Sequence, residues 1–440
     1  MKFASTRGGI APASLDVALA AGLAPDGGLY APERIPQLAL QRAGTTLADT
    51  ATLVLAPWFA ESRLQPSLAE LCTDAFDFPA PLRLLSSPND HLLELFHGPT
   101  AAFKDYAARF LAGCLSRLRD PDAAVPTTIL VATSGDTGAA VGAAFHHRDG
   151  FRVAILYPDG RVSPRQAHGL GCFGDNVHAY RVDGSFDDCQ HMVKQALTDA
   201  GLRTRIPLGS ANSISLGRLL PQTAYYAHAA LGFRERHDAP LNFIVPTGNL
   251  GNALACWLAK RMGLPIGHIV LASNANDVLP RFFSGEDYAP RATIATLANA
   301  MDVGAPSNFE RLRWWHRGDA ELRAAMRAFS VDDASIRASI RHAPDRHGVV
   351  PCPHTATGLH VLEQLRADGD IRPWAVVATA HPAKFETIVE PLVGHAVEPS
   401  PALAAWLARP ATSSPLAIRD DALHSILLAG DHCGNTPRIR

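Results

Sequence analysis

Residues 127–141 read Thr127-Thr128-Ile129-Leu130-Val131-Ala132-Thr133-Ser134-Gly135-Asp136-Thr137-Gly138-Ala139-Ala140-Val141. The first seven form an apolar, β-branched run, which is typical of a strand buried on both faces. Two glycines then mark a turn, and the alanines begin a helix. The free backbone N–H groups of such a turn can bind an anion such as a carboxylate. An ordinary helix start, capped by Ser134 or Asp136, would explain the same residues.

The pattern of a short apolar strand followed by a helix recurs along the chain. Further strands are predicted at residues 151–157, 241–245, 268–272 and 374–378. This alternation predicts an α/β protein whose parallel sheets are covered by helices on both faces. Ligands of such sheets bind beyond the carboxyl ends of the strands, so the residues just after each strand are the candidates for a site.

The chain has 440 residues, which is too long for one compact unit. We expect an N-terminal subdomain over residues 1–90, which are punctuated by proline and glycine and mainly helical. A smaller α/β domain over residues 91–235 would carry Lys104 and the loop from Ser134 to Thr137. A larger α/β domain would occupy residues 236–440.

The bulk composition excludes several classes of partner. With 40 basic and 42 acidic side chains, no electrostatic footprint for nucleic acid is present. No apolar run approaches the ~20 residues that a membrane helix needs, so no membrane partner is expected. Residues 1–9 lack the pattern of a secretory signal. The seven scattered cysteines, without a Cys-x-x-Cys pair, predict reduced thiols in a cytoplasmic protein and no metal site.

Lys104 is the first candidate for chemistry. Apolar residues at 103, 107, 110, 111, 114, 115 and 118 have the spacing of one helix face. With Thr100 as the expected N-cap, Lys104 lies in the first turn, where the helix dipole disfavours a cation. An amine placed there loses its proton more readily and becomes a nucleophile. Taken alone, the local pattern favours an ordinary surface lysine.

A second candidate is Pro246-Thr247-Gly248-Asn249-Leu250-Gly251-Asn252, between a strand and a helix expected at 253–262. Gly248 and Gly251 let the backbone approach a phosphate at the helix N-terminus. No P-loop lysine follows, and the Rossmann glycine spacing is absent, so a small phosphate monoester fits better than a nucleotide. A tight strand–helix turn without a ligand stays an alternative.

Two polar segments lie near the end of the chain. Thr379-Ala380-His381-Pro382-Ala383-Lys384 follows the strand at 374–378 and places a hydroxyl, an imidazole and an ammonium in one turn. His381 is more typical of a hydrogen-bonded core histidine than of a catalyst. Cys352, near His354, is a conceivable nucleophile, but the favoured interpretation is a small apolar core residue.

These segments together resemble the threonine synthase family, whose members are pyridoxal-phosphate (PLP) enzymes of fold type II. The run His97-Gly98-Pro99-Thr100-Ala101-Ala102-Phe103-Lys104-Asp105 looks like the cofactor-lysine motif of that family. Further matching runs follow in the same order: residues 5–8, 26–30, 133–138, 212–214, 301–303, 307–312 and 379–385. The resemblance is to the longer form of the family, which has an extra N-terminal subdomain.

The resemblance implies that the substrate O-phospho-L-homoserine and water give L-threonine and phosphate. A related lyase that releases 2-oxobutyrate from the same substrate stays an alternative. A non-catalytic binding protein is disfavoured, because both Lys104 and the phosphate loop are present. Whether the protein is a monomer or a homodimer stays open.

The resemblance also implies a role for each candidate. Lys104 would hold pyridoxal 5'-phosphate as an imine and move protons at the α and β carbons of the substrate. The other cofactor-binding residues would be Gly248, Asn249, Leu250, Gly251 and Asn252 at the phosphate, Thr379 at the pyridine nitrogen and Asp136 at the cofactor edge. The substrate-binding residues would be Ser134, Gly135 and Thr137 at the carboxylate, with Ser307, Asn308, Lys384 and Arg165 at the phosphate.

Three positions depart from the family pattern. Leu250 stands where an aromatic residue is expected, which a loop that binds through its backbone tolerates. Cys352 stands where an aspartate is expected, and Leu216-Gly217-Arg218 also differs. Any role of a carboxylate at position 352 is therefore absent from this chain.

Overall fold

The computed structural model describes residues 1–429. Its N-terminal part pairs β1 (Phe3–Ser5) with β2 (Tyr30–Pro32) in an antiparallel sheet and adds α1 (Leu15–Ala21), α2 (Leu47–Phe59), η1 (Gln65–Ser67) and α3 (Leu68–Ala75). A capping box defines the start of α2, because Thr46 accepts the N–H of Asp49 while Asp49 accepts the N–H of Thr46. This part of the chain is mainly helical, and α2 packs against α10 (Thr223–His237).

The larger sheet has six strands in the order β11-β10-β9-β12-β4-β3. They are β3 (Leu82–Leu84), β4 (Asp90–Glu94), β9 (Leu241–Pro246), β10 (Ile266–Ser273), β11 (Arg327–Ser330) and β12 (Trp374–Ala378). Every neighbouring pair is parallel except β3 with β4. The carboxyl ends of β9, β12 and β4 therefore lie at one edge of this sheet.

Successive residues of the central strands point to opposite faces of the sheet and belong to different hydrophobic cores. Phe243 and Val245 of β9 pack with α10 and α11 (Gly251–Arg261), whereas Ile244 packs with α15 (Asp333–His347) and α16 (Pro353–Ala367). Both faces of the sheet are thus covered, which is why these strands are apolar without interruption. The remaining helices of this half are α12 (Val278–Phe283), η3 (Asn299–Met301), α13 (Phe309–Trp314), α14 (Asp319–Ala325), η4 (Pro382–Phe385), α17 (Glu386–Val393) and α18 (Pro401–Leu407).

The smaller sheet has five parallel strands in the order β13-β7-β6-β5-β8. They are β5 (Thr127–Ala132), β6 (Phe151–Pro158), β7 (Val177–Val182), β8 (Leu208–Ser210) and β13 (Ser414–Leu416). One face packs on α4 (Lys104–Leu118), α5 (Asp136–Phe145) and α6 (Pro164–Gly171). The other packs on α7 (Phe186–Thr198), α8 (Ala200–Arg205) and α19 (Asp420–Ala429). The short α9 (Leu216–Leu219) and η2 (Leu220–Gln222) lead into α10.

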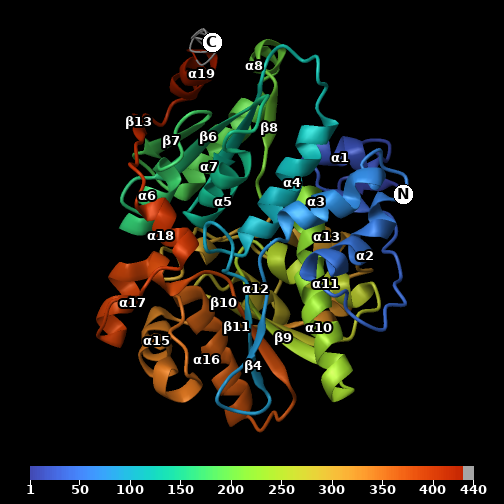
Figure 1. Cartoon of the computed structure of the whole chain (residues 1–440), viewed down its shortest axis with the longest axis vertical. Coiled ribbons are helices and arrows are strands. Elements are labelled where there is room, and N and C mark those ends of the chain that lie inside the picture. Colours follow the sequence, from blue (N-terminus) through green and yellow to red (C-terminus); the bar gives the residue numbers. More distant parts are fainter. Residues whose placement is uncertain (430–440) are drawn as a thin grey trace.

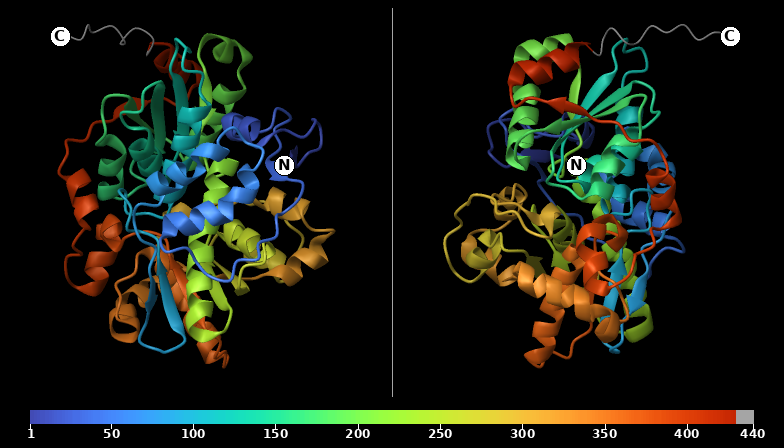
Figure 2. Two further views of the ribbon diagram at one scale, coloured as in Figure 1. Left: turned by 45° about the vertical axis from the view of Figure 1, so that its right-hand side comes forward. Right: turned by 90° about the vertical axis from the view of Figure 1, so that its left-hand side faces the viewer.

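The two sheets lie one above the other, the smaller in the upper half of Figure 1 and the larger in the lower half. The sheets divide the chain differently from the predicted domain ranges in three places. Strand β3, expected in the N-terminal subdomain, belongs to the larger sheet. Strand β4, expected in the smaller domain, belongs to the larger sheet, and β13, expected in the larger domain, belongs to the smaller sheet. The C-terminal segment, drawn in red, returns from the lower half to the upper half to supply β13 (Figure 2).

All five strands predicted from apolar runs are present and parallel, which confirms the α/β class with doubly covered sheets. Among the described residues, no helix is long and apolar enough to span a membrane. Six cysteines are buried and free, and Cys433 lies outside the described residues.

Candidate active site

Backbone hydrogen bonds hold the Lys104 segment against the segment after β12. The N–H of Phe103 donates to the carbonyl of Thr379 (2.9 Å), and the N–H of His381 donates to the carbonyl of Ala101 (3.0 Å). The segments at residues 101–103 and 379–381 thus lie side by side, although most strands of the smaller sheet come between them in the sequence. The arrangement brings the predicted Thr379 next to the residue that precedes Lys104.

Helix α4 begins at Lys104, so the lysine lies in the first turn as predicted, but Thr100 is not its N-cap. The N-cap is Phe103, which makes no side-chain capping bond. The hydroxyl and the N–H of Thr100 instead donate to the buried carboxylate of Asp105 (2.6 and 2.9 Å). These two hydrogen bonds to Asp105 hold residues 100–103 in a turn ahead of the helix.

Asp136 lies between two lysines in the interior. Its Oδ1 is 2.7 Å from Nζ of Lys384, and its Oδ2 is 3.9 Å from Nζ of Lys104. The side chains of Asp136 and Lys384 are only 3% and 4% exposed. Burial opposes ionisation of Asp136, but the positive charges of Lys384 and Lys104 outweigh it, and its pKa lies well below its usual range. The three groups form a buried cation–anion–cation cluster.

Lys104 has the properties of a nucleophilic amine. Burial lowers its pKa to about 8; the charge of Lys384 adds to this effect, and the carboxylate of Asp136 opposes it. About a tenth of the amine is therefore neutral at pH 7, whereas an exposed lysine is almost wholly protonated. The surface-lysine alternative is wrong, because the side chain of Lys104 is only 14% exposed.

Hydrogen bonds to residues from other parts of the chain hold the loop after β9 in place. Asn249 donates to the hydroxyl of Ser213 (2.7 Å) and accepts the N–H of Ser307 (2.5 Å). Asn308, which is fully buried, donates to the carbonyl of Asn249 (3.0 Å) and accepts from Arg311 (2.7 Å). The structure thus places Ser307 and Asn308 against the Gly248–Gly251 loop.

Two backbone features of this loop fit close contact with a ligand. Leu250, the N-cap residue of α11, has a φ of 63°, in the left-handed region that a leucine rarely adopts. A Cβ atom on Gly248 would lie 2.7 Å from the backbone of Met301, so only glycine fits there. The first N–H groups of α11, including that of Gly251, have no partner within the helix and can bind an anion.

The residues present fit the phosphate of PLP. Asn252 accepts hydrogen bonds from the hydroxyls of Tyr225 (2.6 Å) and Tyr226 (2.8 Å), while its buried Nδ2 has no partner in the described part of the chain. A buried donor without a partner is costly unless a ligand satisfies it. The glycine loop and the Asn252 amide together can hold a phosphate monoester.

The turn at residues 133–138 is organised by Thr133. Its Oγ1 accepts the N–H groups of Gly135 (3.0 Å) and Gly138 (2.9 Å), so neither Ser134 nor Asp136 is the cap. Gly135 has a φ of 127°, and a Cβ there would lie 2.5 Å from Gln166. Ser134 and Thr137 are half-buried beside Asp136, and the carbonyl of Ser134 accepts from Asn299 of η3 (3.3 Å).

Arg165 and Lys384 line one small cavity of about 20 Å³, whose wall also includes Thr100, Gly135 and Gln166. Arg165 of α6 donates to the carbonyl of Ala383 (2.8 Å) and lies 3.3 Å from the carboxylate of Glu390. Lys384 of η4 donates to the carbonyl of Thr100 (2.8 Å) and pairs with Asp136. Two ion-paired cations from different helices therefore meet at this cavity.

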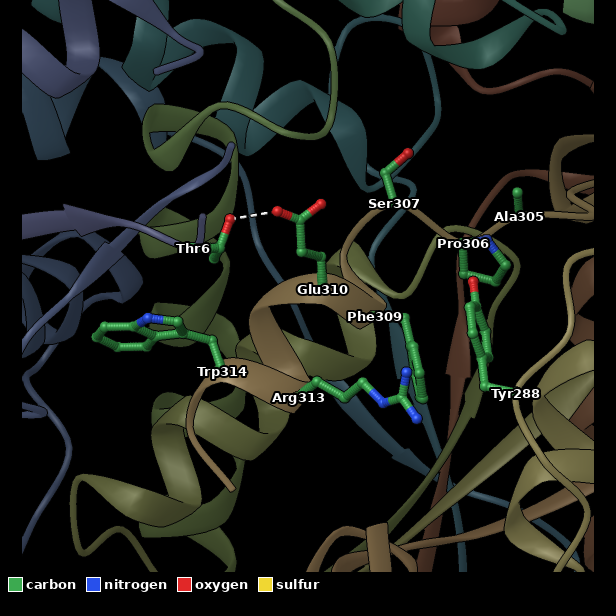
Figure 3. Close-up of a pocket in the computed structure, with 9 residues that line it drawn as sticks. All are labelled: Thr6, Tyr288, Ala305, Pro306, Ser307, Phe309, Glu310, Arg313 and Trp314. Carbon is green, nitrogen blue, oxygen red and sulfur yellow. Dashed lines mark hydrogen bonds between the residues drawn. The ribbon is translucent and has the colours of Figure 1, made fainter. Parts of the chain in front are cut away.

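A second cavity of about 500 Å³ is lined by Ser307, which contacts Asn249 of the glycine loop, together with Tyr288 and Arg313. Figure 3 shows Glu310 pointing across this cavity to Thr6, whose hydroxyl donates to it (2.5 Å). The N-terminal motif at residues 5–8 thus contacts the wall of the site, although it is far from the other motifs in sequence.

The sequence analysis missed His354 and Gln166 as parts of the site. Burial lowers the pKa of His354 to about 4, and its Nε2 accepts the N–H of Ala300 (3.1 Å). Gln166 donates to Asp136 (3.2 Å). Neither residue directly follows a predicted strand, so the sequence pattern does not mark them. His381 is hydrogen-bonded, as expected, but it is a half-buried cap of η4 whose ring accepts the N–H of Ala383 (3.2 Å), not a core histidine.

Cys352 is the N-cap of α16, where its sulfur accepts the N–H of Thr355 (3.4 Å). Burial raises the pKa of its thiol, which excludes a reactive thiolate at neutral pH. The thiol therefore occupies the capping position that an aspartate commonly takes.

Comparison with known proteins agrees with this geometry. A model of the family described as pyridoxal-phosphate dependent enzyme matches residues 89–383. Models for the threonine synthase N terminus and C-terminal part match residues 2–76 and 355–420. The fold is thus that of a PLP-dependent enzyme of fold type II.

Threonine synthase of Serratia marcescens is 37% identical over 391 residues, which cover 88% of this chain and 90% of that protein. The crystal structure of threonine synthase from Escherichia coli is 35% identical, with a TM-score of 0.89 over 98% of this chain and 100% of that one. PLP-bound threonine synthase from Brucella melitensis is 34% identical, with a TM-score of 0.88 over 98% and 99%. The chain belongs to the threonine synthase family.

Proposed function

We propose that this chain converts O-phospho-L-homoserine and water into L-threonine and phosphate. The observation that carries the proposal is Lys104 itself, a buried amine with a lowered pKa that lies 3.9 Å from the carboxylate of Asp136. Family membership supports the same reaction. When bound, PLP supplies an electron sink for charge that develops on the substrate carbons.

In this proposal each cofactor-binding residue has a separate task. Lys104 binds the cofactor covalently, and Gly248, Asn249, Leu250, Gly251 and Asn252 hold its phosphate. Thr379 binds the pyridine nitrogen; a hydroxyl there leaves the ring less electron-withdrawing than a carboxylate would. Asp136 keeps Lys104 and Lys384 apart and neutralises part of their charge at the edge of the cofactor site.

We assign proton transfer at the α and β carbons to the amine of Lys104. A pKa near the operating pH suits a group that must both accept and donate a proton. Since Asp136 opposes the lowering of this pKa, it tunes the amine without contacting the substrate carbons.

Arg165 and Lys384 are proposed to bind the substrate phosphate, because a leaving phosphate needs cationic or N–H partners. Ser134, Gly135 and Thr137 are proposed to bind the carboxylate through the turn before α5. Ser307 lies exposed near the loop and stays a candidate for the phosphate. Asn308 is reassigned as a positioning residue for the loop, because its buried amide is used by Asn249 and Arg311.

The test is a parallel assay of phosphate and threonine with the holoenzyme and O-phospho-L-homoserine. Equal amounts of both products are expected, and none from the Lys104→Ala variant. Phosphate with 2-oxobutyrate in place of threonine would identify the lyase alternative. No phosphate release would overturn the proposal. The cytoplasmic location inferred from the cysteines and the oligomeric state stay predictions.

A further inference from the structure

Two histidines and an aspartate gather on the smaller sheet at the edge opposite the active site. His146 and His147 lie between α5 and β6, and Asp175 lies just before β7. Since β6 and β7 are parallel neighbours, their amino ends meet at the same edge. Helix α5 begins at Asp136 in the active site and ends at this cluster. The cluster therefore lies outside the site described above.

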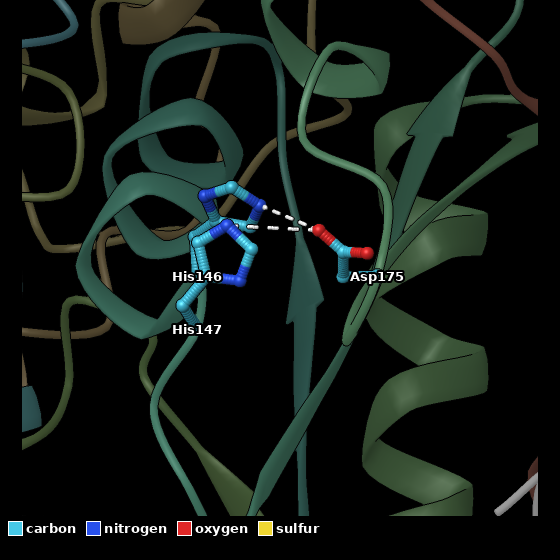
Figure 4. A group of neighbouring side chains, drawn as sticks. All are labelled: His146, His147 and Asp175. Carbon is cyan, nitrogen blue, oxygen red and sulfur yellow. Dashed lines mark ion pairs between the residues drawn. The ribbon is translucent and has the colours of Figure 1, made fainter. Parts of the chain in front are cut away.

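The three side chains converge on one point. Nε2 of His146 and Nε2 of His147 lie 3.5 and 3.6 Å from the same oxygen of Asp175. The three ligand atoms all lie within 4.8 Å of one another. Figure 4 shows both imidazole rings facing this carboxylate from one side. Tetrahedral Zn²⁺ with bonds of about 2.0–2.1 Å needs ligand atoms about 3.3 Å apart, so two of the three separations already fit.

The buried ring nitrogen of His146 has only a distant protein partner. The side chain of His146 is 9% exposed, and its Nε2 makes no hydrogen bond of ordinary geometry within the described residues; the Asp175 oxygen lies 3.5 Å away. Its ring is covered by Phe173 and Trp406, at centroid distances of 5.7 and 6.4 Å. A buried imidazole nitrogen that faces a carboxylate at this distance can bind a metal ion placed between them.

The loops that carry the ligands are held together without a metal. Asn176 accepts the N–H of His147 (3.0 Å) and donates to the carbonyls of Phe145 (2.9 Å) and Phe151 (3.0 Å). This amide ties the turn before β7 to the connection between α5 and β6. The site is therefore formed before an ion arrives, which reduces the entropy cost of binding.

The electrostatic surroundings also suit a divalent cation. The cluster lies at the C-terminal end of α5, where the helix dipole favours positive charge. The carboxylate of Asp175, which faces both imidazoles, would neutralise part of the charge of the ion.

We propose that His146, His147 and Asp175 bind a divalent transition-metal ion of the Zn²⁺ class, with water in a fourth position. Two imidazoles and one carboxylate favour such ions over Mg²⁺ and Ca²⁺, which prefer oxygen ligands. The ion links the end of α5 to the turn before β7 and so stabilises the smaller sheet. The proposal does not depend on the reaction at Lys104.

The test is a calorimetric titration of the untagged holoprotein with ZnCl₂ in a phosphate-free buffer. The variants are His147→Ala and Asp175→Asn, whose side chains are 67% and 64% exposed and whose loss leaves the core intact. The matched control is His424→Ala, since His424 faces Asp199 at 3.7 Å as a surface pair outside the three-residue cluster. Circular dichroism in EDTA establishes that all four proteins are folded alike.

The wild type and His424→Ala are expected to bind one equivalent of Zn²⁺ with equal affinity and to melt at a higher temperature with the ion than in EDTA. Each cluster variant is expected to lose at least tenfold in affinity and most of that thermal shift, since even residues behind the ligands change affinity by about 10–100-fold. Equal affinity in all four proteins, or equal loss in the control, would overturn the proposal. So would an anomalous zinc peak away from the three side chains in a crystal.

Discussion

Replacing Asp136 with asparagine tests the buried charge cluster that sets the reactivity of Lys104. The substitution keeps the shape of the side chain and removes its charge. Lys384 would then be a buried cation whose remaining partner is the carbonyl of Thr100. Removing one partner of a buried ion pair costs about 3–5 kcal/mol, and because the Thr100 bond stays we expect about 3 kcal/mol.

The matched control is Asp319→Asn, which removes the carboxylate of a surface pair. Asp319 lies 2.6 Å from Arg313, almost the same distance as in the buried pair, but the two side chains are 30% and 46% exposed. Such pairs contribute only about 0–1 kcal/mol and are screened by salt. The surface pair has two hydrogen bonds, whereas Lys384 meets Asp136 through one oxygen, so a smaller loss in the surface pair would reflect its exposure and not fewer contacts.

The assay is equilibrium urea unfolding of the apoprotein, followed by circular dichroism and tryptophan fluorescence at low and high salt. The two variants are expected to differ by about 2–3 kcal/mol in apparent free energy of unfolding, with little salt dependence for Asp136→Asn. Losses within about 0.5 kcal/mol of each other would refute the buried-pair reasoning. The same variant should also lower the pKa of Lys104 below about 8, because Asp136 opposes the lowering. The pH dependence of Lys104 labelling by an amine reagent, mapped by mass spectrometry, measures this.

Three further predictions follow from the same geometry. Gly248→Ala should weaken PLP binding at least tenfold in a fluorescence titration, because the new Cβ would lie 2.7 Å from Met301. The control is Gly232→Ala in α10, where the new Cβ would have no atom within 4 Å; this variant should stabilise the protein by up to about 1 kcal/mol. Thr379→Val should lower kcat by about tenfold or more while PLP stays bound, since a lost buried hydrogen bond costs about 1–3 kcal/mol; an unchanged kcat would argue against its contact with the ring. The rate at which apoprotein rebinds PLP should rise with pH through about 8, because the amine of Lys104 is protonated and unreactive below that value; a midpoint near that of free lysine would contradict the assigned burial.

Much of the site was predictable because its elements follow strands. Each apolar run that predicted a strand is a strand, and the loops at Ser134, Gly248 and Thr379 all follow such a run. Lys104 lies at the start of its helix as predicted. The role of each residue toward PLP came instead from resemblance to a family, because local pattern alone favoured a surface lysine.

The departures fall where several partners compete for one polar side chain. Thr100 had the sequence of an N-cap, but Asp105, five residues further along the chain, takes its hydroxyl. Asn308 was expected at the substrate, but Asn249 and Arg311 use its amide. A polar side chain bonds whichever partner the fold brings closest, and a one-dimensional pattern does not contain that partner.

The sequence by itself determined the strand and helix segments, the α/β class and the glycine turns, because hydrophobic periodicity and backbone freedom are local properties. Only the tertiary structure decided the strand order, the return of β13 to the smaller sheet and the placement of Asp136 between Lys104 and Lys384. It alone also brought Asp175 to His146 and His147. These arrangements depend on pairing between residues far apart in the chain, and burial then sets the charge state of each group.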